Sequence, residues 1–140
     1  MPLLDDAGIA ALLRSTQRIA MIGASSNPMR PSNGVFRYLR AVGYDVVPIN
    51  PGETAVEGVP CFPTLAEAVA ATGPFELVDV FRRAELCPAH AREAVAAAAS
   101  CLWLQLGIVS VEAAAIATAA GLSVVMNRCT KIEHVRLIRE

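Results

Sequence analysis

The chain has 140 residues, of which 54% are hydrophobic and 18% are charged, and its formal net charge is −1. This length fits one domain with a single core over residues 1–140, and the composition argues against a disordered chain. The small net charge disfavours the strong electrostatic attraction that binding to nucleic acid or to a membrane surface requires.

The N-terminal part of the chain is predicted to alternate between helices and short apolar strands. Residues 5–14 have the pattern of an amphipathic helix, and residues 18–23 and 44–49 have the pattern of buried strands. Between these strands, Ser32 is expected to cap a helix that runs to about Val42.

The same alternation is predicted for the rest of the chain. Cys61 and Phe62 are expected to form a short extended piece, and Thr64 and Glu67 a capping box for a helix that stops at Gly73. The later elements are a strand at 77–81, a helix at about 85–99, a strand at 101–106, a helix at 110–120, a strand at 122–126 and a helix at 130–139.

Short apolar strands that alternate with helices are typical of a parallel sheet covered on both faces. We therefore predict an α/β fold, a single doubly wound Rossmann-like domain with a five-stranded parallel sheet, strand order 3-2-1-4-5 and helices on both faces. The sequence shows no signal-peptide pattern and no apolar run of about 20 residues. The four cysteines show no metal-ligand spacing, and a cytoplasmic protein with reduced thiols is expected.

In such a sheet, a ligand binds beyond the carboxyl ends of the strands. Conspicuous polar or small residues follow every predicted strand. They are Gly23, Ala24, Ser25, Arg30 and Ser32 after the first, Asn50 and Pro51 after the second, Phe81, Arg82 and Arg83 after the third, Gln105 and Gly107 after the fourth, and Asn127, Arg128 and Cys129 after the fifth. We predict a ligand site at these strand ends.

The chemistry of the first loop suits a phosphate. Small residues after Gly23 permit close approach, the backbone N–H groups of the loop and of the following helix start attract an anion, and arginines add planar donors. Simpler structural roles are open for the same residues. The glycine can merely turn the chain, one of the two adjacent arginines can pair with Glu85, and Arg128 can pair with Glu133.

Two common nucleotide motifs are not matched. The dinucleotide fingerprint needs three glycines and an acidic residue at the end of the second strand, whereas here only the first glycine is present and the strand ends in Asn50 and Pro51. The loop also lacks the Gly-Lys-Ser/Thr of a P-loop. NAD binding in the usual manner is therefore not expected.

The sequence predicts no catalytic residue and no metal site. His90 is expected on a solvated helix face, and no serine or cysteine forms an evident triad with His134. Cys129 lies beside Arg128 and Lys131, two cations that would favour a reactive thiolate. An inert thiol under the last helix is the alternative.

The motifs at the strand ends also occur together in one known family. They are Gly23-Ala24-Ser25 with Asn27-Pro28 and Arg30-Pro31-Ser32, then Pro48–Pro51, Val78–Arg83, Leu102–Gly107 and Asn127–Glu133. In order and spacing over almost the whole chain, they resemble the small single-domain CoA-binding proteins. That fold is similar to the N-terminal CoA-binding domain of the succinyl-CoA synthetase α-subunit.

The resemblance implies a Rossmann-like domain that binds coenzyme A or an acyl-CoA. By position, it implies phosphate contacts at Gly23, Ala24, Ser25 and Arg30, an adenosine side at Asn50 and Pro51, a middle region at Phe81, Arg82 and Arg83, and a pantetheine side at Gln105 and Gly107. In the family, the last motif usually reads Asp-Arg-Cys-Pro. Here it begins with Asn127 and ends with Thr130, so activity that depends on that carboxylate is in doubt.

The larger acyl-CoA ligases also carry a phosphohistidine domain and an ATP-grasp partner, which this sequence does not contain. A binding module without complete ligase chemistry is therefore expected. The alternatives are an enzyme or redox regulator that uses NAD(P) or another nucleotide, and a domain that acts only through a protein partner. We expect a small-molecule ligand and no nucleic acid or membrane, with homo-oligomerisation left open.

Overall fold

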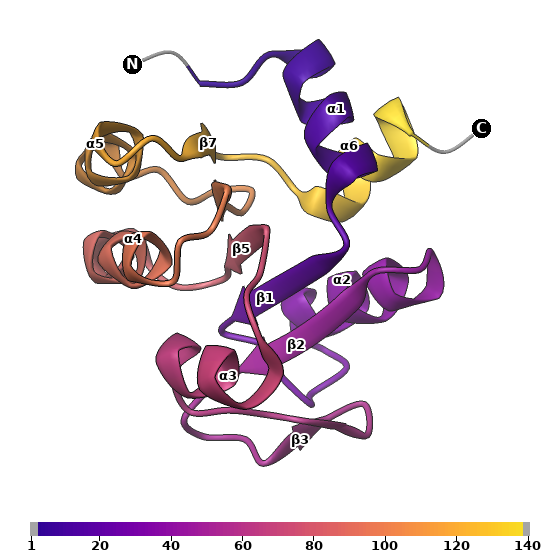
Figure 1. The fold of residues 1–140 in the computed structure, drawn as a ribbon. Coiled ribbons are helices and arrows are strands. Elements are labelled where there is room, and N and C mark those ends of the chain that lie inside the picture. Colours follow the sequence, from indigo (N-terminus) through magenta and orange to yellow (C-terminus); the bar gives the residue numbers. More distant parts are fainter. Residues whose placement is uncertain (1–2, 139–140) are drawn as a thin grey trace.

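The computed structural model describes residues 3–138, and its elements alternate as the sequence predicts (Figure 1). In chain order they are α1 (Asp6–Ser15), β1 (Arg18–Ile22), α2 (Pro31–Ala41), β2 (Asp45–Ile49), β3 (Ala55–Val56), β4 (Val59–Pro60), α3 (Leu65–Thr72), β5 (Leu77–Val80), a 3₁₀ turn (Ala84–Leu86), α4 (Cys87–Ala96), β6 (Cys101–Leu104), α5 (Val111–Ala119), β7 (Ser123–Val125) and α6 (Thr130–Leu137). Residue 139, the predicted end of the last helix, lies outside the described residues.

The main sheet has five parallel strands, as predicted, but the predicted strand order is wrong. The observed order is β2-β1-β5-β6-β7, so the third long strand, β5, pairs with β1 and not with β2. The outer edge of β2 instead forms a single parallel bridge between Ile49 and Phe62. If Phe62 is counted as the third strand, the usual Rossmann order is recovered.

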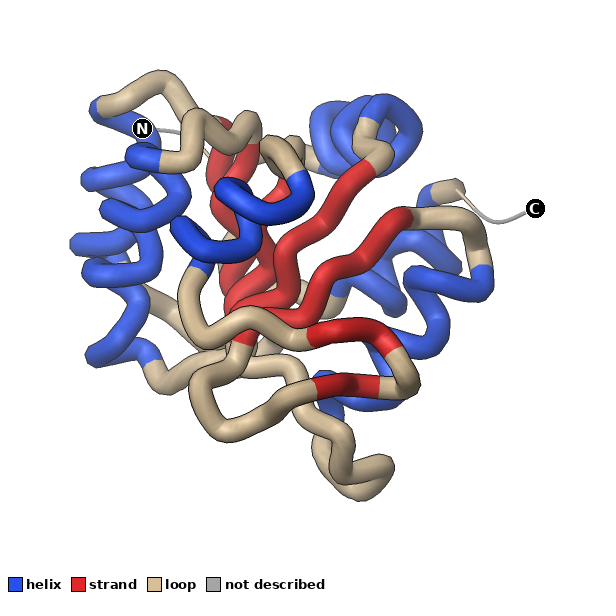
Figure 2. Tube along the Cα trace, turned by 60° about the horizontal axis from the view of Figure 1, so that its bottom comes forward, coloured by secondary structure: helices blue, strands red, loops and turns tan. Residues whose placement is uncertain are grey.

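The short length of that third strand has a local cause. Phe62 lies between Pro60 and Pro63, as Cys61-Phe62 was expected to, and the N–H of Phe62 donates to the Pro48 carbonyl oxygen at 3.1 Å. Proline has no N–H to donate, so pairing cannot extend far in either direction. The chain before Phe62 forms the small β3–β4 hairpin outside the main sheet (Figure 2). Helix α3 then crosses to the far side of β1, where β5 begins.

Two helical layers cover the sheet (Figure 1). Helices α3, α4 and α5 pack on one face, and α1, α2 and α6 pack on the other. Alternate residues of β1 serve the two cores, because Ala20 and Ile22 face the first layer and Ile19 and Met21 the second. The alanines of α4 and α5 let these two helices approach closely over the sheet.

Helix α3 begins as predicted, with Thr64 as its N-cap residue. The Thr64 side chain accepts a hydrogen bond from the Glu67 N–H at 3.2 Å. Ser32 differs from its prediction, because α2 begins one residue earlier, with Pro31 in its first turn and Arg30 as the N-cap residue without a side-chain bond. Ser32 is instead a buried residue of the first turn. Among the helices of residues 3–138, none is long and apolar enough to cross a membrane.

Candidate functional site

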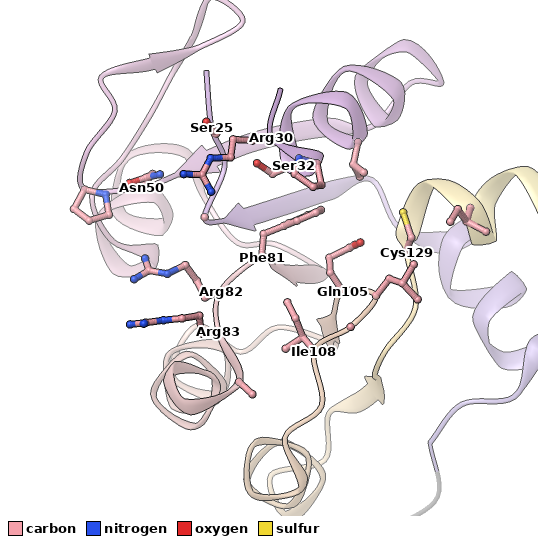
Figure 3. Close-up of a pocket in the computed structure, with 18 residues that line it drawn as sticks. Ser25, Arg30, Ser32, Asn50, Phe81, Arg82, Arg83, Gln105, Ile108 and Cys129 are labelled. Atoms are coloured by element: carbon pink, nitrogen blue, oxygen red, sulfur yellow. The ribbon is translucent and has the colours of Figure 1, made fainter. Parts of the chain in front are cut away.

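A cleft of about 1020 Å³ opens at the carboxyl ends of the central strands, where the strand order reverses around β1 (Figure 3). Ligands of doubly wound sheets bind at this position. Loops after β1, β2, β5 and β6 contribute to its walls, together with the first turns of α2 and α6.

The structure brings almost all the predicted site residues together in this cleft. Those that line it are Gly23, Ser25, Arg30, Ser32, Asn50, Pro51, Phe81, Arg82, Arg83, Gln105 and Gly107. Ala24 is the exception, because its side chain is fully buried in the core beneath the loop. Cys129, which was expected at the end of the fifth strand, also lines the cleft. So do the apolar side chains of Leu106, Ile108 and Ile132, which were not among the predicted site residues.

Gly23 turns the first loop under a tight constraint. Its φ is +88°, a region that L-amino acids with side chains rarely occupy, and a Cβ there would lie 2.5 Å from the Phe81 carbonyl oxygen. The Gly23 N–H donates to the Ile49 carbonyl oxygen at 2.8 Å, so the loop continues the pairing with β2. The loop therefore passes directly over the end of β5, and the position requires a glycine.

Side chains of the loop and of α2 hold the rest of this segment in place. Ser25 Oγ accepts from the Asn27 N–H at 3.1 Å, and Asn27 Oδ1 accepts from the Met29 N–H at 2.9 Å. The buried Asn33 on α2 donates from Nδ2 to the Ser25 carbonyl oxygen at 3.0 Å. The loop is thus ordered by its own polar residues, with the first turn of α2 at the cleft.

Glu53 is a loop contact that sequence reasoning missed. Its carboxylate accepts from the Ser26 N–H at 2.6 Å and from Ser26 Oγ at 2.8 Å, and the backbone bond from Ser26 holds the pKa of Glu53 below its usual value. The end of β2 lacks a carboxylate, but Glu53 supplies one three residues after Asn50. The Ser26 N–H is consequently already occupied by an anionic group.

The predicted site arginines differ in whether they have an ion-pair partner. Within residues 3–138, neither Arg30 nor Arg82 has an ion-pair partner, whereas the exposed Arg83 lies 3.8 Å from Glu85. Arg128 does not line the cleft, because its guanidinium binds Glu133 at 2.6 Å. The structural alternatives considered for one adjacent arginine and for Arg128 are therefore confirmed.

A buried carboxylic acid lies beneath the cleft floor and was not singled out by the sequence. Asp79 on β5 is fully buried, and its two carboxyl oxygens contact Gln105 Nε2 at 2.7 Å and Thr130 Oγ1 at 2.9 Å. Burial raises the pKa of Asp79 to about 7, although both hydrogen bonds act in the opposite direction. A single acid inside the otherwise apolar strand β5 is the sequence signal that could have identified it.

Both described histidines lie away from the cleft lining. His90 was expected in solvent, but it is half-buried and its Nδ1 lies 2.5 Å from Glu93 Oε1. His134 is buried with its Nδ1 2.8 Å from the Tyr38 hydroxyl. Lys131 lies over the Tyr38 ring, so the two cations next to Cys129 in sequence, Lys131 and Arg128, are engaged elsewhere. No group of three or more metal-ligating side chains occurs within residues 3–138.

A Rossmann-like sheet with a cleft at its switch point and a glycine-turned loop beside it is the architecture of nucleotide-cofactor-binding α/β domains. Residues 17–135 match the CoA binding domain, and the chain therefore belongs to this CoA-binding domain family.

Individual relatives agree with this assignment over nearly the whole chain. The uncharacterized protein YneT of Bacillus subtilis (strain 168) is 35% identical over 128 residues, which cover 91% of this chain and 93% of YneT. A hypothetical protein from Pyrococcus horikoshii OT3 is similar in structure, with a TM-score of 0.91, 36% identity and coverage of 96% of this chain and 93% of that one.

A more distant similarity shows the fold alone. The dinucleotide-forming acetyl-coenzyme A synthetase 1 of Ca. Korarchaeum cryptofilum matches with a TM-score of 0.68 and 18% identity. The match covers 79% of this chain but only 26% of the synthetase, so it concerns one domain of that larger protein.

Proposed function

We propose that the chain binds coenzyme A or an acyl-CoA in the cleft, as a cytoplasmic binding module without complete ligase chemistry. The observation that carries the proposal is the division of the cleft into two chemically different halves (Figure 3). One half is cationic and polar, and the other is largely apolar. Coenzyme A has the same division, since charged phosphates and adenosine are followed by a long and less polar pantetheine arm.

The cationic half suits the phosphates. Arg30 and Arg82 reach it as guanidinium groups without ion-pair partners in the described part of the chain, and Ser32 lies in the first turn of α2. Planar guanidinium donors and the positive end of a helix both favour phosphate oxygens. In this pose, Asn50 and Pro51 border the adenosine. Asn50 is itself held by a bond from its Nδ2 to the Ala24 carbonyl oxygen at 2.8 Å.

The other half suits the pantetheine arm. Leu106 and Ile132 line it although they are 61% and 52% exposed, which is unfavourable for apolar side chains unless a ligand covers them. Ile108 and Gly107 continue this surface, with Gln105 as a polar group at its base. Phe81 lies between the two halves in Figure 3 and would contact the ligand near its centre.

The Arg30→Ala variant tests the ligand and the phosphate contact together by isothermal titration calorimetry with CoA, acetyl-CoA, NAD⁺ and NADP⁺. We expect the wild-type protein to bind CoA with a Kd in the micromolar range or tighter, about −8 kcal/mol. Loss of the guanidinium should weaken CoA binding by about tenfold, because a charge-assisted hydrogen bond is removed.

Arg92→Ala is the matched control, since Arg92 is an exposed arginine of α4 that does not line the cleft. It should leave the affinity for CoA unchanged. Binding of a dinucleotide without binding of CoA would favour the NAD(P)-dependent alternative. Heat from none of the four ligands would leave a role through a protein partner.

Cys129 provides a second test, because its thiol lines the apolar half where the end of the pantetheine arm would lie. With oxidised CoA, the Cys129 thiolate would attack one sulfur of the CoA disulfide, form a Cys129–CoA disulfide and release one CoA thiolate. Intact-mass analysis should show this adduct on the wild-type protein and not on Cys129→Ala. An adduct of equal yield on the alanine variant would eliminate Cys129 as the reacting thiol.

A further inference from the structure

Three buried polar side chains from three elements meet beneath the cleft floor. Asp79 of β5, Gln105 after β6 and Thr130 at the start of α6 are 0%, 3% and 0% exposed. Gln105 Nε2 lies 2.7 Å from Asp79 Oδ1 and 3.0 Å from Thr130 Oγ1, and the Thr130 hydroxyl donates to Asp79 Oδ2 at 2.9 Å. The three contacts close a triangle, which fixes each side chain against the other two.

This triangle determines which end of the Gln105 amide faces the cleft. The Thr130 hydroxyl gives its proton to Asp79 Oδ2, so its oxygen can only accept from Gln105, and the Gln105 amide nitrogen must face Thr130 and Asp79 while the carbonyl oxygen points away. Gln105 Oε1 has no hydrogen-bond partner among residues 3–138. Every fully buried side-chain oxygen or nitrogen in those residues does have a partner, so Oε1 is not fully buried. Oε1 therefore opens to the cleft, where Figure 3 shows Gln105 between Phe81 and Cys129.

We infer that Asp79 and Thr130 are positioning residues that hold the Gln105 carbonyl oxygen toward the cleft, where it accepts a hydrogen bond from an amide N–H of the pantetheine arm. The inference rests on the proposed function, and it adds the chemical selectivity of the apolar half. A nearly buried acceptor without a protein partner favours ligands that supply a donor and disfavours those that leave it unpaired. The phosphates and the adenosine would not reach this oxygen.

Substitutions of Thr130 distinguish the positioning role from a role in packing alone. Its hydroxyl donates to Asp79 and accepts from Gln105, so Thr130→Val removes both contacts while keeping the shape of the side chain. Thr130→Ser keeps the hydroxyl and removes only a methyl group. Gln105→Met removes the acceptor itself at similar side-chain length. These three variants differ in polar contacts more than in volume.

The experiment is titration calorimetry of the wild-type protein and the three variants with CoA and with 3′-phospho-ADP, which has the phosphates and adenosine of CoA but no pantetheine. Thr130→Val and Gln105→Met should each weaken CoA binding by about tenfold and leave 3′-phospho-ADP within about twofold, as expected for loss of one buried hydrogen bond. Thr130→Ser should bind both ligands like the wild-type protein.

Equal weakening of both ligands, or unchanged CoA binding in Thr130→Val and Gln105→Met, would overturn the positioning role while leaving the proposed function in place. A wild-type protein that binds neither ligand would overturn the proposed function and this inference with it. Binding of 3′-phospho-ADP reports in each variant that the cleft has folded. If Thr130→Val does not fold, the other two variants still test the inference. Selective loss of CoA binding in Gln105→Met, with normal binding in Thr130→Ser, would support it.

Discussion

Asp79→Asn should make the protein more stable at pH 8, by on the order of 4 kcal/mol in the free energy of unfolding. The reason is that Asp79 is fully buried, and burial raises its pKa from 3.8 to about 7. Above pH 7, the native state must hold a carboxylate that is out of contact with water and has no ion-pair partner within residues 3–138. An asparagine amide of nearly the same shape carries no such cost.

The sign of the pH dependence follows from proton counts. Between pH 4 and pH 7, the native state of the wild-type protein keeps the Asp79 proton that the unfolded chain has lost. The Asp79 contribution to stability therefore falls as pH rises through this window, and it is constant above about pH 7. The advantage of Asp79→Asn should thus be largest above pH 7 and should disappear near pH 4.

Thermal unfolding from pH 4 to pH 8 checks this, with an expected rise in Tm of about 10 °C at pH 8 for a chain of this length. Asp5→Asn is the matched control. Asp5 is an exposed acid that caps α1 by accepting from the Gly8 N–H at 2.8 Å, and asparagine caps helices equally well. Parallel Tm curves for the wild-type protein and Asp79→Asn would show that Asp79 does not titrate in this range.

This stability cost is consistent with the positioning role inferred for Asp79. Above about pH 7, the ionised Asp79 orients the Gln105 amide in one sense because a carboxylate only accepts, whereas an asparagine can accept or donate and so permits both senses. Asp79→Asn is therefore expected to gain stability and lose affinity for CoA. Natural proteins commonly retain such locally unfavourable groups where a site needs them.

Periodicity predicted the layers of the fold, but it could not predict the strand order. Apolar runs identify strands, and the helices between them imply parallel pairing, whichever neighbour a strand takes. The position of β5 depends on Phe62, whose one bridge to Ile49 occupies the free edge of β2. A strand reduced to one residue between prolines has no periodicity, so it was not counted among the strands.

The sequence predicts which residues lie in the cleft when their position at the end of a strand places them there. It does not predict which side chains pair with one another. The carboxyl ends of parallel strands lie at one edge of the sheet, so Gly23, Phe81 and Gln105 meet in the cleft. The bond from Ser26 to Glu53 depends instead on the path of the chain after β2. Likewise, the sequence left open whether Arg128 faces the cleft or pairs with Glu133, and only the structure shows the pair at 2.6 Å.

Gly23→Ala should destabilise the protein by about 2–3 kcal/mol, lower its Tm by about 5–10 °C and weaken CoA binding by more than about tenfold. At φ +88° an alanine is strained in any surroundings. The added Cβ would also lie 2.5 Å from the Phe81 carbonyl oxygen and 3.0 Å from Arg82 Cδ. The backbone after β5 or the loop itself must therefore move, and both belong to the cleft.

Gly34→Ala separates this effect from the loss of a glycine in general. Gly34 lies inside α2, and a Cβ built there meets no atom within 4 Å. Alanine is favoured over glycine in a helix by about 1 kcal/mol, so this variant should be at least as stable as the wild-type protein and should bind CoA normally. If Gly23→Ala matched Gly34→Ala in Tm and in CoA affinity, the loop would not require its left-handed turn. Selective loss in Gly23→Ala would instead show that the same backbone contact shapes both the fold and the phosphate side of the cleft.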